Sequence, residues 1–316
     1  MQNPFKYSDN NKRYHTLDYF YKNKFGKKVC KISLNAGFSC PNKDGTKGTG
    51  GCIYCSKLGS GDFAGKPNKD LITQFNDIKD MMKNKWPDAS YIGYFQANTN
   101  TYAKTDVLKQ KYEPILELDN VIGLSIATRP DAITDDCLEY LELLSKRTYL
   151  TVELGLQTIH EKTTKLINRG HDLKCFDDMV KRLRQKNINV VVHIINGLPY
   201  ETKEMMIETV EHINKLDIQG IKIHMLHIIE DTALASLYKK EEFHVLTKDE
   251  YIDIVIEQLE RLRPEIVINR ITGDPVKEDL IEPKWLIKKF CVLNDIDKEM
   301  LKRNSYQGKK TKGTIN

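Results

Sequence analysis

The sequence predicts an α/β protein, a partial (β/α)6 TIM-type barrel with N- and C-terminal helical additions. Three observations indicate this fold class. Short apolar segments alternate with helical patterns through six β/α units in about 240 residues. The 316 residues can bury a large core, and no internal repeat or low-complexity linker divides them. Six parallel units favour a closed or partly closed barrel; a doubly wound open sheet is the alternative, because strand order is not written in the sequence.

The first predicted elements lead into a cysteine-rich loop. A helix is expected over residues 12–24, where aromatic side chains crowd together before Gly26, and a short buried strand is expected at 29–34. The later strands are expected at 91–96, 121–128, 149–156, 189–195 and 220–227. The helices before them are expected near 69–85, 105–117, 135–146, 173–186 and 202–215.

The C-terminal part continues with a helix near 248–262, an apolar run at 265–271 and a basic helical segment near 284–303. Residues 304–316 lack apolar periodicity, which predicts disorder or ordering by a ligand. The expected division is a basic N-terminal helical extension at 1–27, a barrel at 28–245 and a basic, helical C-terminal extension at 246–316.

Composition and cysteine usage indicate a soluble protein of a reducing compartment. The hydrophobic fraction is 40% and the charged fraction 29%, no run approaches the roughly 18 apolar residues of a membrane helix, and the N-terminus has no apolar signal core. Seven cysteines are present, four of them scattered singly in apolar or helical patterns: Cys30, Cys137, Cys175 and Cys291. Because this is not the pattern of a secreted disulfide framework, we expect a cytoplasmic protein without a membrane partner.

The net charge of +5 is distributed unevenly. Residues 1–66 hold 12 Lys/Arg against 4 Asp/Glu, and residues 284–316 hold 9 against 3, so the middle of the chain is acidic. Basic ends favour a polyanionic partner, since each phosphate contact releases counterions. The alternative is that these lysines only solvate the surface.

Three thiols lie on one glycine-rich loop, CPNKDGTKGTGGCIYC, which spans residues 40–55. They are Cys40, Cys52 and Cys55, and the last two form a C-x-x-C that can clamp one metal or two corners of a cluster. Three soft ligands without a nearby fourth indicate a metal site with one open position. Structural zinc with a distant histidine such as His160 and a dithiol redox motif are the alternatives.

The glycines of this loop need a separate explanation. Their sequence, GTKGTGG, lacks the Gly-Lys-Ser/Thr ending of a phosphate-binding loop. We expect them to bend the chain so that the thiolates converge and backbone N–H groups can approach the sulfur atoms.

With the spacing C-x-aromatic-C, in which Tyr54 is the aromatic residue, the loop resembles that of the radical S-adenosylmethionine (SAM) superfamily. The longer gap of eleven residues between Cys40 and Cys52 resembles the YhcC/YtqA-type branch, which is related to the radical SAM domain of Elongator's catalytic subunit. Further similar segments are YFQANTNTY at 94–102, ATRPD at 127–131, ELGLQT at 153–158, NGLP at 196–199 and KIHMLHI at 222–228.

The resemblance implies a cofactor set. Cys40, Cys52 and Cys55 would hold a [4Fe–4S] cluster as catalytic residues, and its fourth iron would bind SAM. Reduction by a flavodoxin- or ferredoxin-type protein would then cleave SAM to a 5′-deoxyadenosyl radical that abstracts a substrate hydrogen. No second cysteine cluster occurs in the sequence, which argues against an auxiliary cluster.

Polar residues at strand ends complete the candidate site, because barrel active sites form at the C-terminal edge of the sheet. The expected cofactor-binding residues are Tyr54, Gln96, Asn98, Arg129, Glu153 and Gln157. The alternatives are interior hydrogen bonds for Glu153 and Gln157, side-chain turns for Asn98 and a salt bridge from Arg129 to Asp131. The roles of His224, His227 and the turn Arg270–Asp274 stay open.

The basic ends and the resemblance together point to tRNA as substrate. The branch resembles enzymes that process the C5 side chain of wobble uridine from 5-carboxymethylaminomethyl toward 5-aminomethyl. The alternatives are a radical SAM enzyme acting on a small molecule or a protein, and a zinc-stabilised RNA-binding protein without catalysis.

Overall fold

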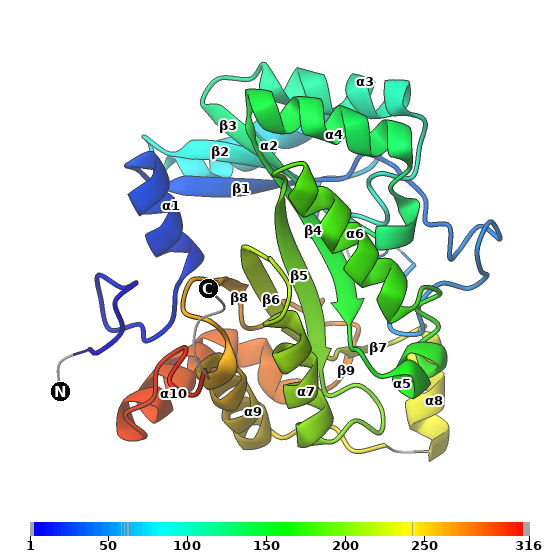
Figure 1. The fold of residues 1–316 in the computed structure, drawn as a ribbon. Helices are drawn as coiled ribbons and strands as arrows, with labels where there is room; N and C mark the ends of the chain where they lie inside the picture. Colours follow the sequence, from blue (N-terminus) through cyan, green and yellow to red (C-terminus); the bar gives the residue numbers. More distant parts are fainter. Residues whose placement is uncertain (1–2, 58, 60, 62, 242, 312–316) are drawn as a thin grey trace. The chain divides into compact units, whose positions relative to one another are not determined.

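The structure is a computed structural model that describes residues 3–311 except 58, 60, 62 and 242 (Figure 1). The chain divides into two compact units. The cysteine-loop unit contains residues 21–155 and 169–191, and the C-terminal unit contains residues 1–20, 156–168 and 192–316. The three-part division expected from the sequence stays a prediction.

The cysteine-loop unit is built on parallel strands. They are β1 (Val29–Leu34), β2 (Ser90–Phe95), β3 (Val121–Thr128) and the first part of β4 (Tyr149–Gln157). Val29 lies opposite Ser90, and Gly123 lies opposite Tyr149. Every residue of β2 is buried, as expected for a strand covered on both faces.

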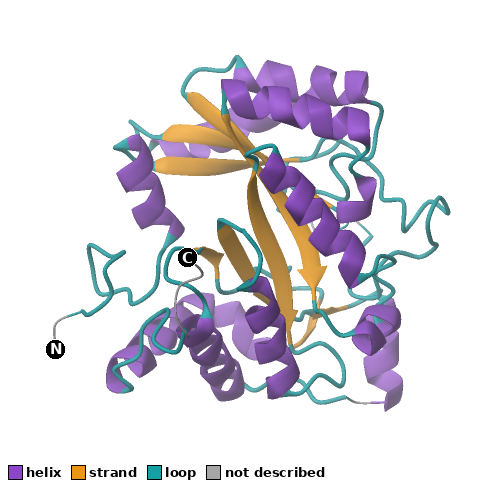
Figure 2. Ribbon diagram, in the orientation of Figure 1, coloured by secondary structure: helices purple, strands orange, loops and turns teal. Residues whose placement is uncertain are grey.

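The helices of this unit are α2 (Leu71–Lys83), α3 (Thr105–Leu116), η1 (Pro130–Ala132), α4 (Asp135–Arg147) and α6 (Leu173–Gln185), together with most of α1 (Leu17–Phe25). Helices α2, α4 and α6 begin at side chains that cap them. Asp70 accepts a hydrogen bond from the backbone of Thr73, and Thr134 accepts one from Cys137. Helices α3 and α4 lie side by side along the strands (Figure 2).

The C-terminal unit contains the remaining elements. Its strands are the end of β4, most of β5 (Asn189–Asn196), β6 (Gly220–Met225), β7 (Ile228–Ile229), β8 (Val267–Arg270) and β9 (Leu280–Glu282). Its helices are α5 (Glu161–Leu166), α7 (Lys203–Ile213), α8 (Ala233–Glu241), α9 (Lys248–Arg261), η2 (Lys284–Lys288) and α10 (Lys289–Lys302). Strands β6 and β8 are parallel, β7 and β9 are antiparallel, and α9 packs against α7 and α10.

The order of strands in the main sheet is β1-β2-β3-β4-β5-β6-β8, the same as their order in the chain. A doubly wound sheet reverses its strand order at a switch point, whereas successive strands of a barrel follow one another. The predicted partial barrel is therefore confirmed, with β8 as an additional strand from the apolar run at 265–271. The strand expected at 220–227 ends earlier, at Met225.

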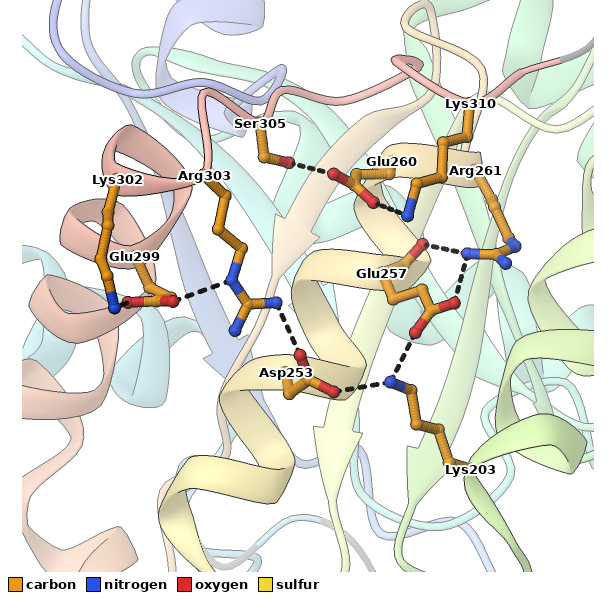
Figure 3. Close-up of polar contacts among 10 residues, drawn as sticks. All are labelled: Lys203, Asp253, Glu257, Glu260, Arg261, Glu299, Lys302, Arg303, Ser305 and Lys310. Atoms are coloured by element: carbon orange, nitrogen blue, oxygen red, sulfur yellow. Dashed lines mark hydrogen bonds and ion pairs between the residues drawn. The ribbon is translucent and has the colours of Figure 1, made fainter.

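The prediction of disorder was wrong for residues 304–311. The hydroxyl of Ser305 donates a hydrogen bond to the carboxylate of Glu260 at 2.8 Å, and Lys310 forms an ion pair with the same carboxylate (Figure 3). The amide of Gln307 donates to the carbonyl of Ile266 at 2.8 Å, and Ser305 and Gln307 are both buried. Polar contacts fix this segment, which explains why apolar periodicity gave no sign of it. Residues 312–316 lie outside the described residues.

In the part of the chain that the structure describes, no helix combines the length and the apolar character needed to cross a bilayer.

Candidate metal centre

Backbone hydrogen bonds fold the loop after β1 so that its two ends meet. The carbonyl of Cys40 accepts from the N–H of Lys43 at 2.8 Å, and the carbonyl of Cys52 accepts from the N–H of Cys55 at 3.0 Å. The carbonyl of Asn42 accepts from the N–H of Gly51 at 2.8 Å and joins the two turns. The three cysteines therefore belong to one compact loop.

Glycine is required at two points of this loop. Gly51 has a φ of +75°, which is costly for residues with a Cβ, and a Cβ there would meet the side chain of Lys43. At Gly48 the backbone is not left-handed, but a Cβ would lie within 3.0 Å of the side-chain oxygen of Asn42. The first glycine permits a turn and the second permits a close approach.

The sulfur of Cys52 is surrounded by donors. Hydrogen bonding from Cys55 lowers the pKa of Cys52 to about 6 despite burial, and the hydroxyl of Tyr54, the positive charge of Arg129 and the amide of Asn42 act in the same direction. The Asn42 nitrogen lies 3.8 Å from the sulfur. The same sharing of a proton, together with burial, raises the pKa of Cys55. Of this pair, Cys52 is therefore the thiol that loses its proton more readily.

Cations surround the same sulfur atoms. The charge of Arg129 acts on Cys40 and Cys52, and that of Lys43 acts on Cys55. Arg169 is only 1% exposed, and burial lowers its pKa to about 10 although Tyr54 and Cys52 lie near enough to oppose this change. Positive charge and N–H donors both stabilise thiolates.

The donor set fits an iron–sulfur cluster. Three thiols on one loop, with cations and hydrogen-bond donors around them, are suitable ligands. Among the described residues, no three His, Cys, Asp or Glu side chains are arranged around a single metal ion. A [4Fe–4S] cluster attaches its cysteines to different irons, so its ligands do not share one centre.

Arg129 is held in a fixed orientation beside this loop. Its Nε and Nη2 donate to the two carboxylate oxygens of Asp131 at 3.0 Å each, and its Nη1 donates to the carbonyl of Arg169 at 2.7 Å. Burial alone would raise the pKa of Asp131, but the hydrogen bonds and charge of Arg129 outweigh it and lower the pKa. The salt bridge weighed as an alternative is thus present, and contact of Arg129 with SAM stays a prediction.

The other predicted residues lie in different surroundings. Glu153 is buried and accepts hydrogen bonds from Lys31 at 2.7 Å and Ser125 at 2.5 Å. Asn98 has a φ of +57°, and Lys43 Nζ lies 3.5 Å from its side-chain oxygen. Gln96 follows β2, and Gln157 ends β4 with a φ of +62° in the C-terminal unit. Cofactor contacts by these four residues stay predictions.

Sequence reasoning missed Asn42, Lys43 and Arg169. Asn42 and Lys43 follow Cys40 and Pro41 directly, so their position within the loop was the available signal. Arg169 lies between α5 and α6, far along the chain from the cysteines, and nothing in its local sequence indicates that it approaches Tyr54.

A second polar cluster lies in the C-terminal unit. The rings of His193 and His224 are 5.2 Å apart, and burial, followed by the positive charges of neighbours that include His193 and Arg270, lowers the pKa of His224 far below its usual range. Arg270 pairs with Asp274 at 2.8 Å. A Cβ at Gly273 would overlap the ring of His227. The turn Arg270–Asp274 is therefore fixed by an ion pair and by a glycine under a histidine ring.

The chain belongs to the radical SAM superfamily. The model of that superfamily matches residues 44–213, and the radical SAM C-terminal domain matches residues 218–302. The protein is therefore a radical SAM enzyme, and its cofactors are a [4Fe–4S] cluster and SAM, as the sequence predicted.

Its relatives place it in the predicted branch. It is 53% identical over 309 residues to the uncharacterized protein YtqA of Bacillus subtilis (strain 168), covering 98% of this chain and 96% of that protein. It is 32% identical over 286 residues to the protein YhcC of Escherichia coli (strain K12), covering 90% and 91%.

More distant similarity links the chain to Elongator-type proteins. The tRNA uridine(34) acetyltransferase of Methanocaldococcus infernus is 29% identical over 138 residues, which are 42% of this chain and 25% of that protein. The solved structure of M. infernus Elp3 lacking its N-terminus has a TM-score of 0.69 at 18% identity and covers 89% of this chain and 64% of that one. The structural likeness confirms the fold.

Proposed function

We propose that this radical SAM enzyme modifies the C5 side chain of wobble uridine in tRNA, converting carboxymethylaminomethyl to aminomethyl. The observation that carries the proposal is the sequence similarity to part of a tRNA uridine(34) acetyltransferase. The similarity covers 42% of this chain and 25% of that protein, and it supports a uridine substrate for the radical chemistry proposed here.

Cys40, Cys52 and Cys55 are proposed as the cluster ligands. A cluster held by these cysteines would supply the single electron for reductive cleavage of SAM. Tyr54 and Asn42 orient the sulfur of Cys52 by hydrogen bonds, and Arg129, fixed by Asp131, holds positive charge beside it. These residues act by binding and orientation.

An exposed surface of the C-terminal unit supports an RNA partner. Phe290, in α10, is 70% exposed, and its ring centre lies 5.4 Å from the ammonium of Lys289. Four further lysines of η2 and α10 are exposed: Lys284, Lys288, Lys298 and Lys302. An exposed aromatic ring suits base stacking, which contributes about 1–3 kcal/mol per base, and the lysines around it suit phosphate contacts.

A reductant and a compartment complete the proposal. We propose a flavodoxin- or ferredoxin-type protein as electron donor, because a radical SAM enzyme needs single electrons. The cytoplasm is the proposed location. The four cysteines outside the loop are scattered singly along the chain, which supports a reducing compartment.

Comparative nucleoside mass spectrometry tests the substrate. In tRNA from cells that lack the gene, 5-carboxymethylaminomethyl-uridine should accumulate at the expense of its aminomethyl product, and a plasmid with the intact gene, but not its Cys52→Ala variant, should restore the pattern. An unchanged tRNA profile would remove the tRNA assignment and favour a small-molecule or protein substrate for the same radical chemistry.

Binding of tRNA tests the exposed surface separately. Phe290→Ala and Lys288→Glu should each weaken binding to bulk tRNA at moderate salt, while substitution of the exposed Lys162 of α5, Lys162→Glu, should not. If Phe290→Ala and Lys288→Glu bind tRNA with the same affinity as Lys162→Glu and the wild type, this surface is not part of the interface.

A further inference from the structure

Asn42 is buried at the centre of the cysteine loop. Its residue is 1% exposed, its carbonyl accepts from Gly51 at 2.8 Å, and its side-chain nitrogen lies 3.8 Å from the sulfur of Cys52. Asn42 therefore links the backbone of the loop to one of its three thiols.

Two glycines enclose the side-chain oxygen of Asn42. A Cβ at Gly48 or at Gly170 would in each case lie within 3.0 Å of this oxygen. Gly48 belongs to the cysteine loop and Gly170 follows α5, so backbones from distant parts of the sequence lie against the same atom. The amide oxygen cannot move toward either glycine without a shift of that backbone.

The orientation of the amide matches the chemistry of its neighbours. A thiolate or a cluster-bound cysteine sulfur accepts hydrogen bonds, and of the two ends of the amide only the nitrogen can donate one. With the oxygen enclosed by the glycines, the nitrogen is directed at Cys52. Hydrogen bonds to ligating sulfur atoms are one of the factors that set the reduction potential of an iron–sulfur cluster.

We propose that Asn42 is a positioning residue whose amide, enclosed by Gly48 and Gly170, donates a hydrogen bond to the sulfur of Cys52 and raises the reduction potential of the cluster bound there. The physical reason is charge: reduction adds an electron to the cluster and its sulfurs, and a nearby N–H dipole stabilises the added negative charge. The proposal rests on Cys52 as a cluster ligand and does not depend on the substrate.

Three variants separate the hydrogen bond from other effects. Asn42→Ala removes the donor, Asn42→Asp replaces it with a negatively charged acceptor of nearly the same shape, and Gly48→Ala keeps the amide but pushes its oxygen. Thr46→Ala is the control, since Thr46 lies in the same loop and bonds to Tyr102 through its hydroxyl. Gly48 suits substitution better than Gly170, whose φ of +82° would add backbone strain.

The experiment is a redox titration of anaerobically reconstituted full-length protein, followed by electron paramagnetic resonance, with iron content measured on the same samples. We expect a more negative midpoint potential in Asn42→Ala and Gly48→Ala, a larger shift in Asn42→Asp, and no shift in Thr46→Ala. Resonance Raman spectra should show altered iron–cysteine stretching in the variants that shift.

Two results would overturn the proposal. Potentials equal to the wild type at full iron content would mean that the amide does not act on the cluster. Loss of iron in all three test variants would assign Asn42 to folding of the loop instead. Neither result bears on tRNA, and an unchanged tRNA profile in cells would leave the potentials unaffected, so the two proposals fail separately.

Discussion

A buried ion pair of the cysteine-loop unit leads to a quantitative stability prediction for Lys31→Met. Lys31 Nζ lies 2.7 Å from Glu153 Oε1, and the Glu153 side chain is 0% exposed. Unit charges at this distance attract by about 6 kcal/mol at an effective dielectric constant of about 20, and desolvation offsets part of this. Removing one partner leaves a carboxylate buried without its ammonium, which costs about 3–5 kcal/mol of unfolding free energy.

The positions of the two tryptophans allow the loss of unfolding free energy to be measured in the cysteine-loop unit alone. Trp86 follows α2 in the cysteine-loop unit, whereas Trp285 lies in η2 of the C-terminal unit. In a Trp285→Phe background, fluorescence during urea denaturation reports on the unit that contains Lys31. The midpoint should fall in Lys31→Met, and adding Glu153→Gln should recover part of the loss because no buried charge remains.

Lys146→Met is the matched control. Lys146, whose side chain is largely exposed, pairs with Glu142 on α4 of the same unit, at 3.0 Å, and such a pair contributes at most about 0.5 kcal/mol. A cost for Lys31→Met no larger than that of the control would refute the reasoning. So would strict additivity of the Lys31 and Glu153 substitutions, because it would show that the two charges do not interact.

Three further predictions follow from the site and the C-terminal unit. Alanine at all three loop cysteines should abolish iron binding and brown colour after anaerobic reconstitution, measured by iron analysis and absorbance. Glu260→Gln should weaken the contacts to Ser305 and Lys310 in Figure 3 and speed hydrogen exchange in residues 304–311, at a cost of about 1–3 kcal/mol. Burial and the charge of Arg270 lower the pKa of His227 from 6.5 to about 4. The free energy of unfolding should therefore fall by up to about 3 kcal/mol as the pH falls through this range. The His227→Gln variant should lose less, as measured by urea denaturation at each pH.

A specific result would contradict each of these three predictions. Iron retained by the triple alanine variant would remove the loop as the cluster site. Unchanged exchange in Glu260→Gln would mean that Gln307 and the backbone hydrogen bonds hold the segment without the Glu260 carboxylate. Stability falls with pH because, between pH 6.5 and 4, His227 binds a proton in the unfolded chain but not in the folded protein. Equal pH profiles of stability for the wild type and His227→Gln would show that this histidine does not take up a proton on unfolding.

The barrel was predictable because its evidence is local. Each strand and helix shows its own apolar pattern, and the order of strands in the sheet repeats the order in the chain. The ordered segment after α10 was not predictable, because it is held by hydrogen bonds to Glu260 and to backbone carbonyls near β8. Polar contacts between distant segments leave no periodicity.

Only the local part of the candidate site was predictable, and its cofactor contacts stay predictions. The spacing of the cysteines identified the ligands as candidates and the family as a resemblance. The Arg129–Asp131 pair was visible because its members are two residues apart. Arg169 and Gly170 approach the loop only through the fold, so no reading of neighbouring residues could find them.

Enclosure of Asn42 by Gly170 has a consequence for the order of events on the ribosome. The cysteine loop is synthesised early, but the backbone that closes over Asn42 is made about 130 residues later, after the chain has passed through residues 156–168 of the other unit. A nascent chain shorter than this lacks the backbone that lies against the Asn42 side-chain oxygen. We therefore expect the full surroundings of Cys52 to form only after residue 170 has been synthesised.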